Sequence, residues 1–280
     1  MPSTALSERA ARAALAAHFP PHQVAAHLAH HCAEEVWQYE VDHDASGRLA
    51  QYTPREELAN AQLTCQFVIP SDDVWPAALA DLGPNCPLGL WVRGHEQLPQ
   101  LTARAVAVTG NRAATAKALT RTKAFATAVA EAGHTVTATL AYGVDATAHG
   151  AAAQAGRATL AVLPRGLDRA HPHDHAQLLS SIPASGGAVV SLFPPGTPAS
   201  GATLRASAAL LAALVRAVVL VEALDHAEAM HTAETAADLN RPVLVPPPTG
   251  DVRADGNVRL LAEQRAVLVP DPAHALAELR

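Results

Sequence analysis

Short apolar segments alternate with longer segments of helical periodicity over most of the chain after residue 102. The apolar segments lack polar alternation, which is typical of strands buried on both faces of a parallel sheet. The expected strands cover residues 105–109, 135–140, 158–163, 188–192, 217–221, 243–245 and 266–269. The expected helices cover residues 114–132, 144–155, 174–182, 203–214, 229–238 and 256–263. Strands that alternate with helices predict an α/β fold with a doubly wound, Rossmann-like, mostly parallel sheet.

The first hundred residues follow a different pattern. Residues 5–36 predict two short helices, separated where two prolines follow Phe19. Residues 42–57 are polar and lack periodicity, so they predict a loop. Ser71 or Asp72 is a candidate N-cap for a further helix.

A second, smaller domain is expected from this contrast. Residues 88–94 predict one short strand that ends in glycine, before the alternating pattern begins. We therefore expect a small helical N-terminal domain with its linker at residues 1–66, and a Rossmann-like domain at residues 67–280.

The composition sets limits on the core and on the partners. The chain is 49% hydrophobic but only 4% aromatic, so alanine, leucine and valine must form the core. The net charge of −6 argues against a grip on nucleic acid by the whole protein. Residues 97–130, however, contain basic residues and no acid. This segment is either a solvated helix face or an anion-binding edge.

The cysteines and the apolar segments indicate the cellular compartment. Cys32, Cys65 and Cys86 form no CxxC motif, which favours a reducing cytoplasm. The first residues lack the apolar core of a signal peptide, and the longest apolar run, at 208–215, is too short to span a bilayer. We expect a cytoplasmic protein without membrane contact.

Ligands of open α/β sheets bind at the carboxyl ends of the strands, so these ends give candidate site residues. The first expected strand ends in Thr109-Gly110-Asn111-Arg112. Glycine lets the backbone approach a ligand, the next helix offers free N–H groups to an anion, and Arg112 supplies a forked donor. Lys117 and Arg121 share one face of that helix.

The second strand end carries Tyr142, Gly143 and Asp145, and His149 lies one helical turn after Asp145. This spacing predicts a carboxylate–imidazole pair. The pair is open to three interpretations, which are a helix cap beside a buried histidine, the positioning of a ligand, and acid–base catalysis. The third strand ends before Arg165 and Gly166.

Two clusters resemble metal ligands. The first contains His171, His173, Asp174 and His175, but the segment also suits a helix entry. The second, at 30–32, consists of three consecutive residues, which point to different faces of a helix. We favour structural roles for both clusters and expect no metal and no cofactor.

Five ordered blocks resemble the motifs of the DprA/Smf family. Val108-Thr109-Gly110-Asn111-Arg112 is similar to its Val-x-Gly-[Ser/Thr/Ala]-Arg turn, and residues 140–149 are similar to its Leu-Ala-x-Gly-Ile-Asp-x-x-Ala-His signature. The blocks at 156–172, 193–198 and 217–223 follow in the family's order, and residues 72–76 and 90–94 are similar to the segment that precedes the domain. The resemblance covers roughly residues 68–272.

The chain departs from the family pattern at two places. Residues 204–209 lack the family's Arg-Asn-Arg cluster, and residues 227–230 replace its Ser-Gly-Ser-Leu turn with a segment that carries the acid Glu228. Both departures are expected beside the ligand cleft.

The resemblance implies a non-enzymatic protein of natural transformation and DNA recombination. Family members bind single-stranded DNA, protect it, form homodimers and help to load a RecA-type recombinase. With few aromatics, we expect contacts to the DNA backbone rather than base stacking. The expected DNA- or phosphate-binding residues are Gly110, Asn111, Arg112, Lys117, Arg121, Tyr142, Gly143, Asp145, His149, Arg165 and Gly166.

Other functions remain open at this point. The chain could be a divergent nucleotide sensor of the same fold, or a scaffold that has lost its DNA binding. An enzyme similar to the phosphoribohydrolases is disfavoured, because their Pro-Gly-Gly-x-Gly-Thr-x-x-Glu motif is absent.

Overall fold

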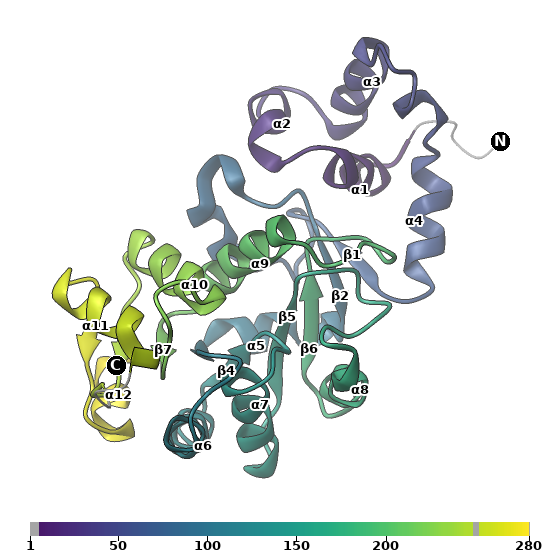
Figure 1. Ribbon diagram of the computed structural model, residues 1–280. Helices are drawn as coiled ribbons and strands as arrows, with labels where there is room; N and C mark the ends of the chain where they lie inside the picture. The colour runs from purple at the N-terminus through teal and green to yellow at the C-terminus, as the bar shows by residue number, and fades with distance from the viewer. Residues whose placement is uncertain (1–5, 249–251, 280) are drawn as a thin grey trace.

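A nine-stranded sheet forms the centre of the computed structural model, which describes residues 6–248 and 252–279 (Figure 1). From one edge to the other, the strands are β1 (Gln66–Val68), β2 (Leu90–Arg93), β6 (Ala188–Ser191), β5 (Thr159–Leu163), β4 (Thr135–Ala138), β3 (Ala105–Thr109), β7 (Val218–Leu220), β8 (Val243–Val245) and β9 (Val267–Leu268). The β1–β2 and β2–β6 pairs are antiparallel, and all other pairs are parallel. The predicted doubly wound, mostly parallel sheet is confirmed.

Helices cover both faces of the sheet because successive strand residues point to opposite sides. In β3, Ala105 and Ala107 join one buried cluster, whereas Val106 and Val108 join another. The first cluster packs under α5 (Leu98–Ala103), α9 (Gly201–Leu214), α10 (Glu228–Asp238) and α11 (Asp255–Ala262). The opposite face packs under α6 (Ala116–Glu131), α7 (Val144–Gln154), α8 (Ala176–Ala184) and α12 (Pro272–Glu278).

The winding of the sheet reverses between β3 and β7. The chain proceeds from β3 through β4 and β5 to β6 in one direction, and from β7 through β8 to β9 in the other. The loops that leave β3 and β7 therefore diverge, which opens a crevice at the carboxyl ends of these two strands.

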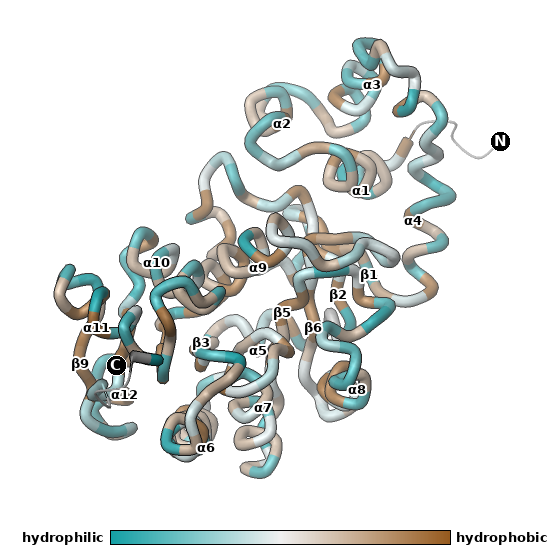
Figure 2. Tube along the Cα trace, viewed as in Figure 1, coloured by the Kyte–Doolittle hydropathy of each residue, from teal (hydrophilic) through white to brown (hydrophobic). Residues whose placement is uncertain are grey.

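Helices dominate the N-terminal part, which lies at one end of the molecule in Figure 1. The elements are α1 (Glu8–His18), α2 (Pro21–Leu28), α3 (Ala33–His43), a short 3₁₀ turn η1 (Leu49–Gln51) and α4 (Pro54–Gln62). The predicted break after Phe19 separates α1 from α2, but a third helix, α3, begins at Ala33 within the range predicted to hold two. The predicted loop at 42–57 is wrong at both ends, because α3 continues to His43 and α4 begins at Pro54. This helix buries only Leu58 and Ala61 and is largely hydrophilic in Figure 2, so its sequence lacks an apolar stripe.

The helix predicted to begin at Ser71 or Asp72 is also wrong. The Asp72 carboxylate accepts hydrogen bonds from the two terminal guanidinium nitrogens of Arg9, both at 2.7 Å, and from the N–H of Ile69 at 2.8 Å. Asp72 therefore fixes a turn instead of capping a helix, and a 3₁₀ segment, η2 (Ala77–Asn85), follows. Arg9 also donates to the carbonyl of Phe67, so it ties α1 to β1.

The remaining short elements are the 3₁₀ turns η3 (His95–Gln97), η4 (His173–His175) and η5 (Val252–Ala254). Within the described residues, no helix combines the length and the apolar character that crossing a membrane requires.

Candidate functional site

A cavity of about 290 Å³ lies at the point where the winding reverses. Its lining comes from the carboxyl ends of β3, β4, β5 and β7 and from the facing sides of α9 and α10. Gly110, Asn111, Arg112 and Asp145 are among the lining residues, so the structure brings these four predicted site residues together. The segments at 204–208 and 227–229 form the opposite wall, which places both departures from the DprA/Smf pattern at the cavity.

Two glycines allow the loops around the cavity to pack closely. A Cβ atom on Gly110 would lie 2.6 Å from the Glu222 carbonyl oxygen. Gly143 has φ +74°, and a Cβ atom there would lie 2.4 Å from the carbonyl oxygens of both Asn111 and Arg112. The loop after β4 therefore rests directly on the backbone that carries Arg112.

A buried carboxylate joins β7 to the loop after β3. Glu222 is 2% exposed, and its oxygens accept the Thr115 N–H at 3.1 Å, the Thr115 hydroxyl at 2.6 Å and the Asn111 amide at 3.2 Å. Thr115 is also the N-cap of α6. The carboxylate thus supplies a negative charge at the positive end of the α6 dipole, where an anionic ligand was predicted.

The side chain of Asn111 is held by hydrogen bonds within the protein. It is buried, its amide also donates to the carbonyl of Arg253, and its side-chain oxygen accepts the N–H of Leu224. These bonds connect the loop after β3 to the loop after β7 and to η5, and they position the neighbouring Arg112.

Arg112 is half exposed at the cavity and forms an ion pair with Glu228, the first residue of α10. His171 lies near this pair. Burial lowers the pKa of His171, the charges of Arg112 and Arg165 lower it further, and Glu228 opposes them. The Nε atom of Arg165 is buried and has no hydrogen-bond partner. Arg112, Glu228 and His171 therefore meet at the cavity.

Asp145 holds the ends of β3 and β4 together. Its side chain is 2% exposed and accepts the Thr109 hydroxyl at 2.8 Å and the Thr139 N–H at 3.1 Å. Burial raises the pKa of Asp145 to about 6, although hydrogen bonds from Thr139, Thr109 and the Gly110 N–H oppose this effect.

The predicted Asp145–His149 pair is wrong. His149 lies beneath the site at 1% exposure, where Nε2 donates to the Thr139 carbonyl at 3.1 Å and Nδ1 lies 2.9 Å from the Thr159 hydroxyl. Burial lowers its pKa to about 4, so the ring is neutral at pH 7. The two side chains share a helix face, but each finds its partners on the strands.

The other predicted residues do not line the cavity. Lys117 is exposed in the first turn of α6, whereas Arg121 donates to the Pro247 carbonyl at 2.7 Å. Tyr142 is exposed, one residue before Gly143. Gly166 packs closely against Pro194, whose carbonyl oxygen would lie 2.4 Å from an added Cβ.

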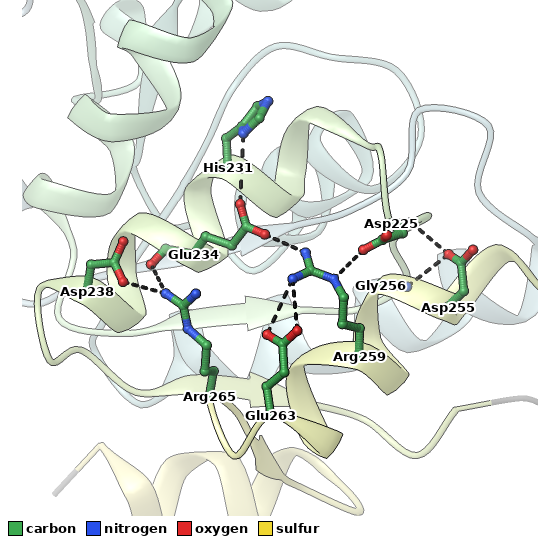
Figure 3. A network of polar contacts seen from close by, with 9 residues as sticks. All are labelled: Asp225, His231, Glu234, Asp238, Asp255, Gly256, Arg259, Glu263 and Arg265. Atoms are coloured by element: carbon green, nitrogen blue, oxygen red, sulfur yellow. Dashed lines mark hydrogen bonds and ion pairs between the residues drawn. The ribbon is translucent and has the colours of Figure 1, made fainter.

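An ion-pair network supports the wall formed by the loop after β7 (Figure 3). Arg259 of α11 contacts Asp225 in this loop, Glu234 of α10 and Glu263 of its own helix. The Asp225 N–H donates to Asp255 at 2.7 Å. These contacts fix the loop that leads to Glu228.

In the loop after β5, the side chains of the cluster at 171–175 do not converge on a common metal position. His175 Nδ1 donates to the Leu140 carbonyl at 2.6 Å, and Asp174 accepts the Tyr142 hydroxyl at 2.7 Å. Across the part of the chain that the structure describes, no group of three or more His, Cys, Asp or Glu residues is arranged to hold a metal ion.

Sequence reasoning did not select Glu222 or His171 as site residues. A signal for Glu222 was present, because it is the only acid in the apolar run 217–223. In the sequence, His171 resembles only a metal ligand. Its place at the cavity follows from the path of a loop, which the sequence pattern does not predict.

Comparisons with known proteins identify relatives. A family model described as DNA recombination-mediator protein A matches residues 66–280. The chain is 35% identical over 214 residues to the putative DNA processing protein DprA of Mycobacterium tuberculosis, covering 73% of this chain and 55% of that protein. It is 33% identical over 216 residues to protein Smf of Escherichia coli, covering 76% and 56%. The chain thus spans about half the length of these relatives.

Two solved structures share the fold. The X-ray structure of DNA processing protein A from Streptococcus pneumoniae matches with a TM-score of 0.78 at 24% identity, over 98% of this chain and 94% of that one. DNA processing protein A from Helicobacter pylori, described for its single-stranded DNA binding mode, matches with a TM-score of 0.68 at 23% identity, over 76% and 95%.

Proposed function

The chain belongs to the family of DNA recombination-mediator protein A, and from this premise we propose that it binds single-stranded DNA at the carboxyl edge of its sheet. The observation that carries the proposal is the cavity at the reversal of the winding, with Arg112 held at it by the backbone of two loops. Arg112, Lys117 and Arg165 supply the charge for phosphates, and Gly110, Gly143 and Gly166 let the loops that carry these groups pack closely.

The proposal assigns a binding role and no catalytic residue. Asp145 and His149 are the residues suited to acid–base chemistry, and the hydrogen bonds to Thr109, Thr139 and Thr159 give both a structural role. In this proposal the protein acts in the cytoplasm, protects incoming DNA and assists a RecA-type recombinase.

A homodimer is part of the same proposal. The sheet ends at β9, where Val267 and Leu268 are 42% and 50% exposed. An exposed apolar edge strand is a surface that soluble proteins usually cover.

The test is fluorescence anisotropy with a labelled single-stranded oligonucleotide and the matching duplex, repeated over a range of salt concentrations. We expect binding to the single strand with a log–log salt slope of roughly −2 to −4, because each neutralised phosphate contributes about −0.7. Absence of binding at low salt would refute the proposed function.

Arg112→Ala is expected to weaken single-strand binding by about 5- to 10-fold at low salt and to reduce the salt slope by about 0.7, because one phosphate contact is lost. Thermal unfolding should change little, since the Arg112–Glu228 pair is half exposed. Arg157→Ala is the matched control, because Arg157 is exposed just before β5, at the opposite edge of the sheet. Equal losses in the two variants would contradict the assignment of Arg112.

Glu228→Gln is expected to strengthen binding by about 5-fold, because the carboxylate competes with phosphate for Arg112. The gain should disappear at high salt as the charges are screened. Glu131→Gln removes one exposed acid at the far end of α6 and serves as the control. A Glu228→Gln variant with unchanged affinity would show that the ion pair does not oppose the strand.

The second candidate is a small nucleotide as ligand, which the volume of the cavity favours. A thermal-shift screen with nucleotides separates the two proposals. Stabilisation by a mononucleotide, without oligonucleotide binding, would support the sensor.

A further inference from the structure

Tyr142 is an exposed aromatic ring at the proposed binding edge. Its side chain is 43% exposed, on the loop between β4 and α7. Among the tyrosine, phenylalanine and tryptophan residues that the structure describes, only Tyr39 is also exposed. Tyr39 belongs to α3, outside the sheet. The aromatic content of the chain is low, but one ring lies where a ligand is expected.

The ring of Tyr142 is held in place although burial contributes little to it. Its hydroxyl donates to Asp174 at 2.7 Å, and its ring meets the ring of His175 edge-on, with centroids 4.8 Å apart. His175 is itself anchored by the Leu140 carbonyl. The hydrogen bond to Asp174 also raises the pKa of Tyr142. An exposed ring that is held by its hydroxyl and by a neighbouring ring is preorganised for binding.

Tyr142 is next in sequence to the residue at which the loop after β4 contacts the loop after β3. The next residue, Gly143, lies against the carbonyl oxygens of Asn111 and Arg112. Tyr142 and Arg112 therefore project from neighbouring loops, at the ends of adjacent strands β4 and β3. A strand of nucleic acid that runs along the carboxyl edge of the sheet would meet both residues.

We propose that Tyr142 stacks on a base of the bound strand while Arg112 binds a neighbouring phosphate. This inference rests on the proposed function and adds the group that distinguishes a single strand from a duplex. The bases of a single strand can unstack from one another and stack on a protein ring, whereas the bases of a duplex are paired and stacked inside the helix. Stacking on an aromatic face accepts every base, so Tyr142 would bind a strand of any sequence. The low aromatic content thus does not limit the protein to backbone contacts.

The test measures the binding of four proteins to two ligands by anisotropy. The proteins are the unaltered chain, Tyr142→Ala, Tyr142→Phe and the control Tyr39→Ala. The ligands are an oligothymidylate and an abasic strand of equal length, which keeps the phosphates and lacks the bases.

Tyr142→Ala should bind the oligothymidylate about 10-fold more weakly and the abasic strand as well as the unaltered chain does. Its salt slope should stay the same, because no phosphate contact is lost. Tyr142→Phe keeps the ring and should retain most of the affinity, and Tyr39→Ala should retain all of it.

An equal loss on both ligands, or no loss on either, would overturn the stacking role. These outcomes are distinct from a failure of the proposed function, in which the unaltered chain itself would bind neither strand.

Discussion

Gly143→Ala is expected to lower the free energy of unfolding by about 3–5 kcal/mol, from strained backbone and overpacking together. Gly143 has φ +74° and ψ −119°, a conformation that disfavours any side chain. A Cβ would also lie 2.4 Å from two backbone carbonyl oxygens, and backbone atoms can move only if the loop after β3 moves. The variant should therefore also lose the position of Arg112.

Gly150→Ala is the matched control for this variant. Gly150 lies in the same helix, α7, and nothing lies within 4 Å of an added Cβ. Alanine should stabilise this helix by up to about 1 kcal/mol, because glycine is the poorer helix former. Chemical denaturation of both variants measures the two effects. Equal stability of the two variants would mean that the β4–α7 loop is not held as the structure describes.

Asp145→Asn and His149→Gln are expected to change the pH dependence of stability in opposite directions. Asp145 has a pKa of about 6 in the folded protein, above its ordinary 3.8. The folded state holds its proton more tightly than the unfolded chain, so this group makes stability fall as the pH rises from about 4 to 6. His149 has a pKa of about 4, below its ordinary 6.5. The unfolded chain binds that proton more tightly, so this group makes stability fall as the pH drops from 6.5 to about 4.

The two contributions oppose each other over almost the same pH range, and each is about 3 kcal/mol. In the unaltered protein they largely cancel. Asp145→Asn leaves His149 uncompensated, and this variant should become unstable towards pH 4. His149→Gln leaves Asp145 uncompensated and should gain stability towards pH 4.

The measurement is urea denaturation of the three proteins at half-unit steps from pH 4 to pH 7. The profile of the unaltered chain is subtracted so that other titrating groups drop out. Parallel profiles for all three proteins would show that neither group is held with the shifted pKa values.

The parallel part of the sheet was predictable because its strands are buried on both faces and are therefore largely apolar. Residues 105–109 and 159–163 are buried on both faces, and such strands appear in the sequence as unbroken apolar runs. The shortest elements do not show this pattern. β1 has only three residues and an exposed Gln66, and α4 buries two side chains. The turn at Asp72 depends on Arg9, which is 63 positions away in the sequence. The division into domains at residue 66 stays a prediction.

At the site, the sequence predicted which residues end the strands but not how their side chains pair. Asp145 and His149 have helical spacing, yet the threonines on neighbouring strands bind each of them. The glycines were interpreted as space for a ligand, but Gly110 and Gly143 make room for protein backbone. The roles of the predicted residues in DNA binding stay predictions, which the Arg112 and Tyr142 variants test.

The way in which α1 and α4 cover β1 and β2 has a consequence for the preparation of fragments. Phe67 and Trp91 are 1% and 2% exposed because Ala10, Leu58 and their neighbours complete the same apolar cluster. A fragment cut at the start of the family match would uncover these two rings along an open sheet edge. Such a surface favours self-association. The isolated α/β part would therefore aggregate or recruit a substitute cover, and its oligomeric state would not report that of the intact chain.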